Sequence, residues 1–223
     1  AGYLGRVYLC REESSRPSGR RRSRGDFVSK RELMHTGRGR CPPFLPGTGV
    51  DLVGHAPPVS QGARSVIILE PHETLDVLLP TDPVEMDQFG RDFIPRLIVV
   101  REGQAVLFKN SEDELHTVHV QNADGESLFN VAMPIQGGRY DHTFGEAGDY
   151  AVSCNAHQEM HATILVFKSP YAVVAERDGA FALSDVLPGT YDLILRRGPQ
   201  RHQEVVEIVA GSNEVTLDFP SLE

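Results

Sequence analysis

Gly148-Asp-Tyr-Ala-Val-Ser-Cys154-Asn-Ala-His157-Gln-Glu-Met160 is the stretch of the chain that decides the fold. A predicted strand, Gly148–Cys154, runs directly into a turn-like loop that carries a thiol, an imidazole and a thioether. Turn residues such as Ala147-Gly148 precede this strand, and short strands separated by similar turns recur through most of the chain. Because these strands are regularly spaced and no convincing long helix interrupts them, the sequence predicts an all-β sandwich or barrel.

The short β-type runs begin near residue 46, after a segment rich in Arg, Ser and Gly. Thr81–Arg91 lacks a strand pattern, and we expect an irregular loop with a little helix there. The predicted strands ahead of residue 170 are Ser65–Glu70, Arg96–Arg101, Gln104–Asn110, His116–Asn122, Arg139–Phe144, Gly148–Cys154 and Ala162–Lys168. Those that follow are Tyr171–Glu176, Ala180–Leu183, Tyr191–Arg196, Glu204–Val209 and Glu214–Phe219.

The loop after Gly148–Cys154 has the ligand types of a blue copper site. Two His and one Cys in a trigonal set, with a long and weak axial Met, are the ligands of blue copper electron-transfer centres. Sulfur from Cys154 and Met160 suits Cu(I), whereas an imidazole such as that of His157 holds Cu(II). The alternative interpretation is a buried structural Cys beside surface His and Met residues.

The second imidazole has to come from an earlier strand, where His116 and His119 compete. Alternate side chains of a strand share one face. His116 therefore shares a face with Val118 and Val120, and a face that carries Val residues is expected to be the core face. The predicted metal ligands are thus His116, Cys154, His157 and Met160, with His119 pointing outward.

The segment from Phe144 to Met160, together with Val106-Leu-Phe108-Lys-Asn110 and the following His116, resembles the copper-loop region of amicyanin-like cupredoxins, the methylamine-utilisation type of blue copper protein. The resemblance covers roughly residues 86–168. It implies a cupredoxin-type Greek-key β-sandwich, expected over residues 80–168, that holds one type 1 copper ion.

The same resemblance implies that Asn110 hydrogen-bonds near the Cys ligand and ties the two ligand loops together. Ending a strand in a turn is the simpler alternative for this Asn. The chain departs from the family pattern at two positions, because Gln158 replaces the usual Pro after the second His and Thr117 replaces the usual Asn after the first. Neither change removes a ligand, but both are expected to alter loop stiffness and reduction potential.

Several classes of copper enzyme are excluded by the residues around the thiol. Multicopper oxidases and copper nitrite reductases flank this Cys with a His that serves a second copper centre, whereas Ser153 and Asn155 stand here. The binuclear centre of cytochrome oxidase needs a second Cys in the loop. No Walker loop, zincin helix or nucleophile elbow is present either. The chain is therefore not expected to be an enzyme.

Residues 171–191 resemble carboxypeptidase-regulatory-like (transthyretin-like) β-sandwich modules, although two initial strands are missing directly before them. Thr48–Val53 and Ser65–Glu70 are candidates for those strands. The expected organisation is therefore nested, with the 80–168 domain inserted into a second, small transthyretin-like β-sandwich that is built from residues 46–75 and 170–221.

Charge divides the chain into a basic tail and an acidic body. Residues 1–40 contain eleven of the 22 Lys and Arg residues and four of the 31 acids, so 11 basic and 27 acidic residues remain beyond them. We expect residues 1–45 to be a disordered basic extension, or alternatively a patch for an anionic surface. Pairing of Cys10 with Cys41 stays open.

The net charge of −9 argues against a nucleic-acid partner, and no apolar run is long enough to span a bilayer. The leading interpretation is a one-electron carrier that serves a redox partner protein, an unknown dehydrogenase or cytochrome. A periplasmic or other extracytoplasmic location is expected, although no signal peptide is visible. His157 should lie nearest to solvent and form the electron exit. The alternatives are a copper carrier or sensor module, or a structural β-sandwich protein with a vestigial site.

Overall fold

The computed structural model describes residues 49–59, 61–209 and 214–218. The predicted basic extension, together with Cys10 and Cys41, whose pairing was left open, lies outside them. Within the described part the regular elements are all β-strands, as predicted, and none is a helix that could span a membrane. The strands are β1 Val50–His55, β2 Val66–Pro71, β3 Val84–Gln88, β4 Phe93–Ile94, β5 Leu97–Arg101, β6 Ala105–Asn110, β7 His116–Gln121, β8 Ser127–Met133, β9 Arg139–Thr143, β10 Gly148–Ser153, β11 His161–Phe167, β12 Tyr171–Val174, β13 Ala180–Val186, β14 Gly189–Arg197, β15 Gln200–Ile208 and β16 Glu214–Asp218.

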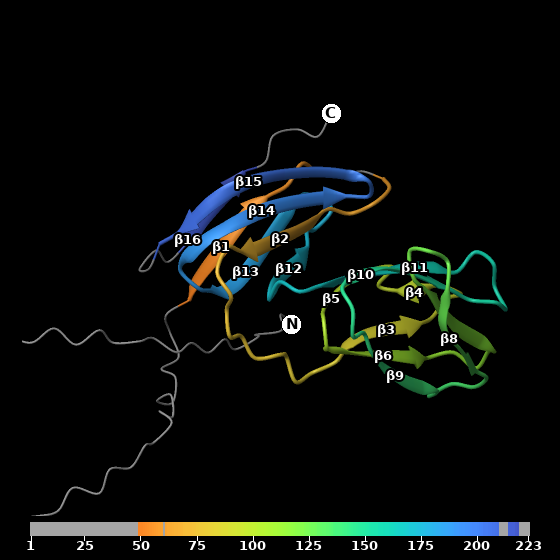
Figure 1. Ribbon diagram of the computed structural model, residues 1–223. Coiled ribbons are helices and arrows are strands. Elements are labelled where there is room, and N and C mark those ends of the chain that lie inside the picture. The colour runs from red at the N-terminus through yellow and green to blue at the C-terminus, as the bar shows by residue number, and fades with distance from the viewer. Residues whose placement is uncertain (1–48, 60, 210–213, 219–223) are drawn as a thin grey trace, which may run out of the picture.

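These strands form two lobes (Figure 1). In one lobe, the sheet β13-β1-β16 faces the sheet β12-β2-β14-β15 across a shared apolar core that includes Leu52, Leu69 and Leu193. β1 pairs with β13 and β16, and β2 lies between β12 and β14. Strands from residues 50–71 therefore complete sheets whose other strands come from residues 171–218.

The other lobe contains β3–β11 and carries the predicted metal ligands. One sheet has the order β5-β11-β10-β7-β8, and the other has the order β4-β3-β6-β9. Their inner faces enclose a core that includes Phe93, Phe108, Val118 and Ile164. Alternate residues of β7 are buried, as expected for a strand with one face on a core. The end of β10 and the start of β7 thus lie side by side at one end of this sandwich.

The loop predicted at Thr81–Arg91 is wrong, because β3 occupies its centre. β3 pairs in parallel with β6, a partner that lies about twenty residues further along the chain. Met86 and Gln88 are fully buried, whereas Glu85 lies on the outer side and pairs with Lys109 at 2.8 Å. A buried Gln among acidic residues obscured the alternation that marks a strand.

Two further strands, β4 and β8, were also absent from the predicted set. β8 is an edge strand that pairs with β7, and most of its side chains are exposed or half-buried. Its hydrophobic residues therefore do not alternate cleanly, and only the pairing with β7 identifies it.

The two lobes meet along an apolar contact. Val66 and Ile68 of β2 and Ile194 of β14 pack in one cluster with Leu165 of β11. Arg196 adds an ion pair with Asp149 across this contact. The contact lies on the outer face of β11, because neighbouring Ile164 points into the core that also holds Cys154 and Met160.

Candidate metal centre

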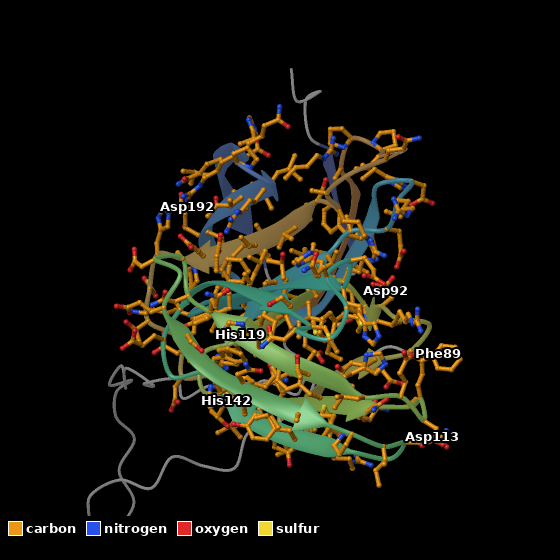
Figure 2. All side chains as sticks on the ribbon, turned by 90° about the vertical axis from the view of Figure 1, so that its right-hand side faces the viewer. Phe89, Asp92, Asp113, His119, His142 and Asp192 are labelled. Atoms are coloured by element: carbon orange, nitrogen blue, oxygen red, sulfur yellow. The ribbon has the colours of Figure 1, made fainter. Side chains whose placement is uncertain are left out.

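β7 presents His116 to the interior and His119 to the exterior, as strand alternation predicted. The His116 side chain is 0% exposed, and Val118 and Val120 on the same face are equally buried. His119 lies on the opposite, exposed side, where its Nε2 is 3.0 Å from Oγ of Ser127 (Figure 2). Of the two competing imidazoles, only that of His116 can reach a site inside the sandwich.

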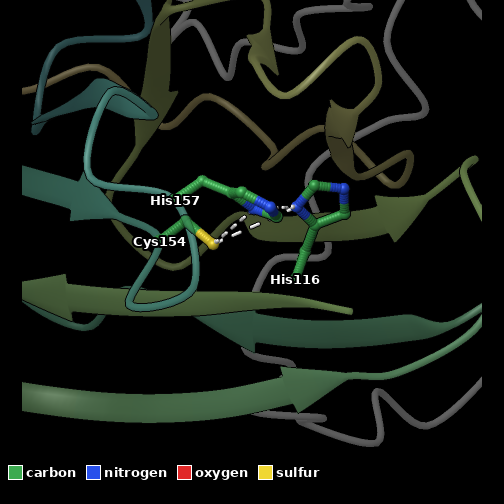
Figure 3. A group of neighbouring side chains, drawn as sticks. All are labelled: His116, Cys154 and His157. Carbon is green, nitrogen blue, oxygen red and sulfur yellow. Dashed lines mark hydrogen bonds between the residues drawn. The ribbon is translucent and has the colours of Figure 1, made fainter. Parts of the chain in front are cut away.

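The loop after β10 returns the chain to the neighbouring strand β11. The N–H of Cys154 donates to the carbonyl of Met160 at 3.3 Å, and the N–H of Met160 donates to the carbonyl of His157 at 3.1 Å. Ser153 and His161 close the pairing of the two strands. These bonds fold residues 154–160 into a compact turn, and the thiol and the imidazole of this turn meet His116 (Figure 3).

Three donor atoms converge in this arrangement. Sγ of Cys154 is 4.0 Å from Nδ1 of His116 and 3.8 Å from Nδ1 of His157, and the two Nδ1 atoms are 3.2 Å apart. Around a first-row ion such as Zn²⁺, bonds of about 2.0 Å to nitrogen and 2.3 Å to sulfur at trigonal angles separate the donors by about 3.5 to 3.7 Å. The spacing of the three side chains therefore fits a single metal ion.

Met160 completes the predicted donor set in sequence. Its side chain is 0% exposed and belongs to the same apolar cluster as Cys154. Two soft sulfur atoms and two imidazoles favour copper over harder ions. The axial role of Met160 stays a prediction, as does the assignment of all four residues as ligands.

Hydrogen bonds favour the thiolate form of Cys154, which is the form that binds metals. Burial alone would raise its pKa, but the N–H of Thr117 and the imidazoles of His116 and His157 favour the thiolate and lower the pKa from 9.0 to about 6. The bond from the Thr117 N–H to Sγ measures 3.3 Å. The hydrogen bond between His157 and Cys154 also raises the pKa of His157, and the contact of His157 with Glu114 raises it further.

Thr117 is a site residue that strand reasoning missed. Its hydroxyl accepts a hydrogen bond from the N–H of Asn155 at 2.7 Å and lies 3.8 Å from Sγ of Cys154. Thr117 thus ties β7 directly to the ligand loop, with both its backbone and its side chain. The departure of Thr117 from the usual Asn was the sequence signal, although it was interpreted only as a change in loop stiffness and reduction potential.

Asn110 is buried at the end of β6 and anchors a different part of the centre. Its amide donates to the carbonyls of Glu114 and Met133, both at 2.9 Å, and its Oδ1 accepts from the N–H of Glu112 at 2.9 Å. These bonds shape residues 111–115, the loop that leads into His116. The link from Asn110 to the Cys154 loop, which the family resemblance implies, stays a prediction.

Two carboxylates of that loop contact the imidazoles. Oε2 of Glu112 is 3.0 Å from Nε2 of His116, and Oε1 of Glu114 is 3.1 Å from Nε2 of His157. Backbone N–H groups of Arg91 and Gly90 lower the pKa of Glu112, and the Arg91 guanidinium lowers that of Glu114. Sequence reasoning missed both residues, because acids in a polar loop are usually only solvated.

Comparison with known proteins finds one family match, over the segment that carries these side chains. Residues 83–167 match the model of the plastocyanin/azurin family of copper binding proteins. No curated protein matched the chain. Similar solved structures include a purple cupredoxin from Nitrosopumilus maritimus, which is 20% identical in sequence. The match covers 38% of this chain and 99% of that chain, with a TM-score of 0.34.

A second is amicyanin from Paracoccus versutus, which is 22% identical in sequence; the match covers 48% of this chain and 100% of that chain, with a TM-score of 0.36. A third is a copper-containing nitrite reductase from Thermus scotoductus, which is 25% identical; the match covers 44% of this chain and 25% of that chain, with a TM-score of 0.33. The family match covers β3–β11, the same segment that brings together the thiol and both imidazoles. Residues 83–167 are thus similar to the plastocyanin/azurin family of copper binding proteins.

Proposed function

We propose that the protein is a one-electron carrier with a single type 1 copper ion, held by His116, Cys154 and His157 with Met160 as a weak axial ligand. The observation that carries this proposal is the convergence of Sγ and two Nδ1 atoms within 4.0 Å of one another, from two buried side chains and one half-buried side chain. A bound copper ion would supply the couple between Cu(I) and Cu(II) at this position.

The protein residues contribute rigidity. Thr117 holds the thiolate with its N–H and holds the following loop residue, Asn155, with its hydroxyl. Cys154 and His157 are both bonded to Met160 through the backbone. Donors held at fixed positions need little rearrangement when the charge of the centre changes, which favours fast electron exchange.

The route for the electron is proposed through His157. The His116 side chain is 0% exposed, whereas that of His157 is 14% exposed. His157 is thus the imidazole nearer to solvent, and a redox partner that docks at this end would approach it first. We further propose that the partner is a dehydrogenase or cytochrome, that the location is extracytoplasmic, and that the protein has no catalytic activity of its own.

Two rates distinguish an electron carrier from a copper carrier: the rate of oxidation and reduction, and the rate of Cu(I) release. An electron carrier is oxidised and reduced rapidly by small redox reagents and loses Cu(I) slowly to a competing chelator, because the copper is enclosed by fixed ligands. Stopped-flow absorbance measures the first rate and the chelator colour measures the second. Copper lost within seconds to a moderate chelator, together with sluggish redox cycling, would replace this proposal with a carrier function.

The ligand assignment has a matched pair of variants on one strand. His116→Ala should abolish the thiolate-to-copper absorption, whereas His119→Ala should retain it, because only the first imidazole reaches Cys154. Equal loss of absorption in both variants would refute the assignment.

We also propose the nested organisation, in which the 80–168 domain is inserted into a carboxypeptidase-regulatory-like sandwich built from residues 46–75 and 170–221. The pairing of β1 with β13 and of β2 with β12 and β14 supports this division.

A further inference from the structure

The two imidazoles of the proposed copper site are held at both of their nitrogen atoms. Nδ1 of His116 and Nδ1 of His157 face the thiol of Cys154. On the far side of each ring, Nε2 meets a carboxylate of the 111–115 loop, Glu112 at 3.0 Å and Glu114 at 3.1 Å. Each ring thus spans the short distance between a metal-binding pocket and a carboxylate.

We infer that Glu112 and Glu114 are positioning residues, which fix both imidazoles through Nε2 and lower the reduction potential of the copper. This inference rests on the proposed copper site. A carboxylate at Nε2 keeps the ring proton on that nitrogen, so Nδ1 presents its lone pair to the pocket. It also makes the ligand more basic and adds negative charge, which stabilises Cu(II) more than Cu(I).

Both carboxylates are fixed by their own partners. Oε2 of Glu112 accepts from the N–H of Arg91 at 3.2 Å. The Arg91 guanidinium binds Glu114 with two bonds, Nε to Oε2 at 3.2 Å and Nη2 to Oε1 at 2.8 Å. Asn110 holds the loop backbone by bonds to the N–H of Glu112 and the carbonyl of Glu114. The loop is therefore shaped to present two acids, and their contacts with the imidazoles are not those of freely moving side chains.

These contacts are partly shielded from solvent, so the carboxylate charges can affect the reduction potential of the copper. His116 is fully buried, and the side chain of Glu112 is 21% exposed, so their interaction is less screened than one at the open surface. Glu114 is more exposed at 38% and shares its charge with Arg91. Asp113 stands between the two acids in sequence, is exposed, and lies at the same end of the molecule as Phe89 and Asp92 (Figure 2).

Asp113 provides the matched control. Glu112→Gln and Glu114→Gln keep an acceptor oxygen of similar shape but remove the charge, and Asp113→Asn removes the same charge from the same loop. Voltammetry of each copper-loaded full-length variant at one pH and ionic strength measures the potential. We expect both Gln variants and their double variant to retain the intense colour, and to show potentials raised clearly above those of wild type and Asp113→Asn.

A second measurement reads the imidazole contacts without a redox change. In the Zn²⁺-substituted protein, nitrogen-15 NMR should show both rings protonated at Nε2. Exchange of these protons with water should accelerate about tenfold or more in Glu112→Ala at His116 and in Glu114→Ala at His157, because a charge-assisted hydrogen bond is lost.

Four outcomes separate the inference from the proposed copper site. Gln variants that shift the potential no more than Asp113→Asn would overturn the inference, as would ring protons whose exchange is unchanged in the Ala variants. A wild-type protein that binds Cu(II) without intense colour would instead overturn the proposed copper site. Raised potentials in coloured Gln variants, with an unshifted Asp113→Asn, would support both.

Discussion

Replacing Thr117 by Val tests how the ligand loop is held. Val has nearly the shape of Thr but lacks the hydroxyl, so Thr117→Val removes the acceptor that binds the N–H of Asn155 at 2.7 Å. The backbone N–H of Thr117 remains and still donates to Sγ of Cys154 at 3.3 Å. The variant should therefore keep its copper and its colour, and lose the two contacts of the hydroxyl with the loop, the short bond from Asn155 and the 3.8 Å contact with Sγ of Cys154.

The size of the effect follows mainly from the bond with Asn155, which is much the shorter of the two contacts. A hydrogen bond of this kind contributes about 0.5 to 1.5 kcal/mol net, which corresponds to a factor of about 2 to 12 in a rate or equilibrium constant. If the bond must break before the loop opens, Cu(I) should leave Thr117→Val about 2 to 12 times faster than wild type. The assay is the absorbance of a Cu(I) chelator in excess at fixed pH.

Thr117→Ser is the control, because it retains the hydroxyl and should release Cu(I) at nearly the wild-type rate. Asn110→Ala is the informative comparison, since the hydrogen bonds of Asn110 hold the 111–115 loop. Wild-type release from Thr117→Val would refute this account of the loop, and faster release from Asn110→Ala alone would transfer the role to that Asn.

Three further predictions concern the axial position, the lobe organisation and the thiol. Met160→Gln should lower the reduction potential and Met160→Leu should raise it, because the axial ligand tunes blue copper sites; voltammetry with no shift in either variant would show that Met160 does not face the copper. A fragment of residues 170–223 lacks β1 and β2 and should not fold, and linking residues 46–75 to it should restore cooperative unfolding; a cooperative melt of 170–223 alone would contradict the nesting. In the metal-free protein the pKa of Cys154 is about 6 when folded, against 9.0 ordinarily, so the folded state gains stability as pH rises from 6 to 9 and loses it as pH falls through 6. This gain is at most about 4 kcal/mol and should vanish in Cys154→Ser; denaturant midpoints with the same pH slope in both proteins would contradict the lowered pKa.

The placement of the candidate ligands could be predicted from the sequence because their geometry is local. Cys154 and His157 lie three residues apart in one turn, and burial alternates strictly along β7, so strand parity distinguishes His116 from His119. Residue type and short-range geometry are sufficient for predictions of this kind.

The features that were missed depend on contacts between distant residues. β3 forms by pairing with β6, and the buried Gln88 within it carries no apolar signal. Glu112 and Glu114 acquire their roles only when the loop folds over the imidazoles and Arg91 reaches it from another loop. A charged residue in a polar segment gives no sign of such partners in the sequence.

Optical and electron paramagnetic resonance spectra of the Cu(II)-loaded protein are the decisive test of whether Cys154 and the two imidazoles bind one type 1 copper ion. We expect one copper per chain, an intense thiolate-to-copper charge-transfer band in the visible range, and the small copper hyperfine splitting of a thiolate-bound site. Both features should disappear in Cys154→Ser. A weakly coloured Cu(II) protein, whose tetragonal resonance spectrum is the same in wild type and Cys154→Ser, would contradict the claim.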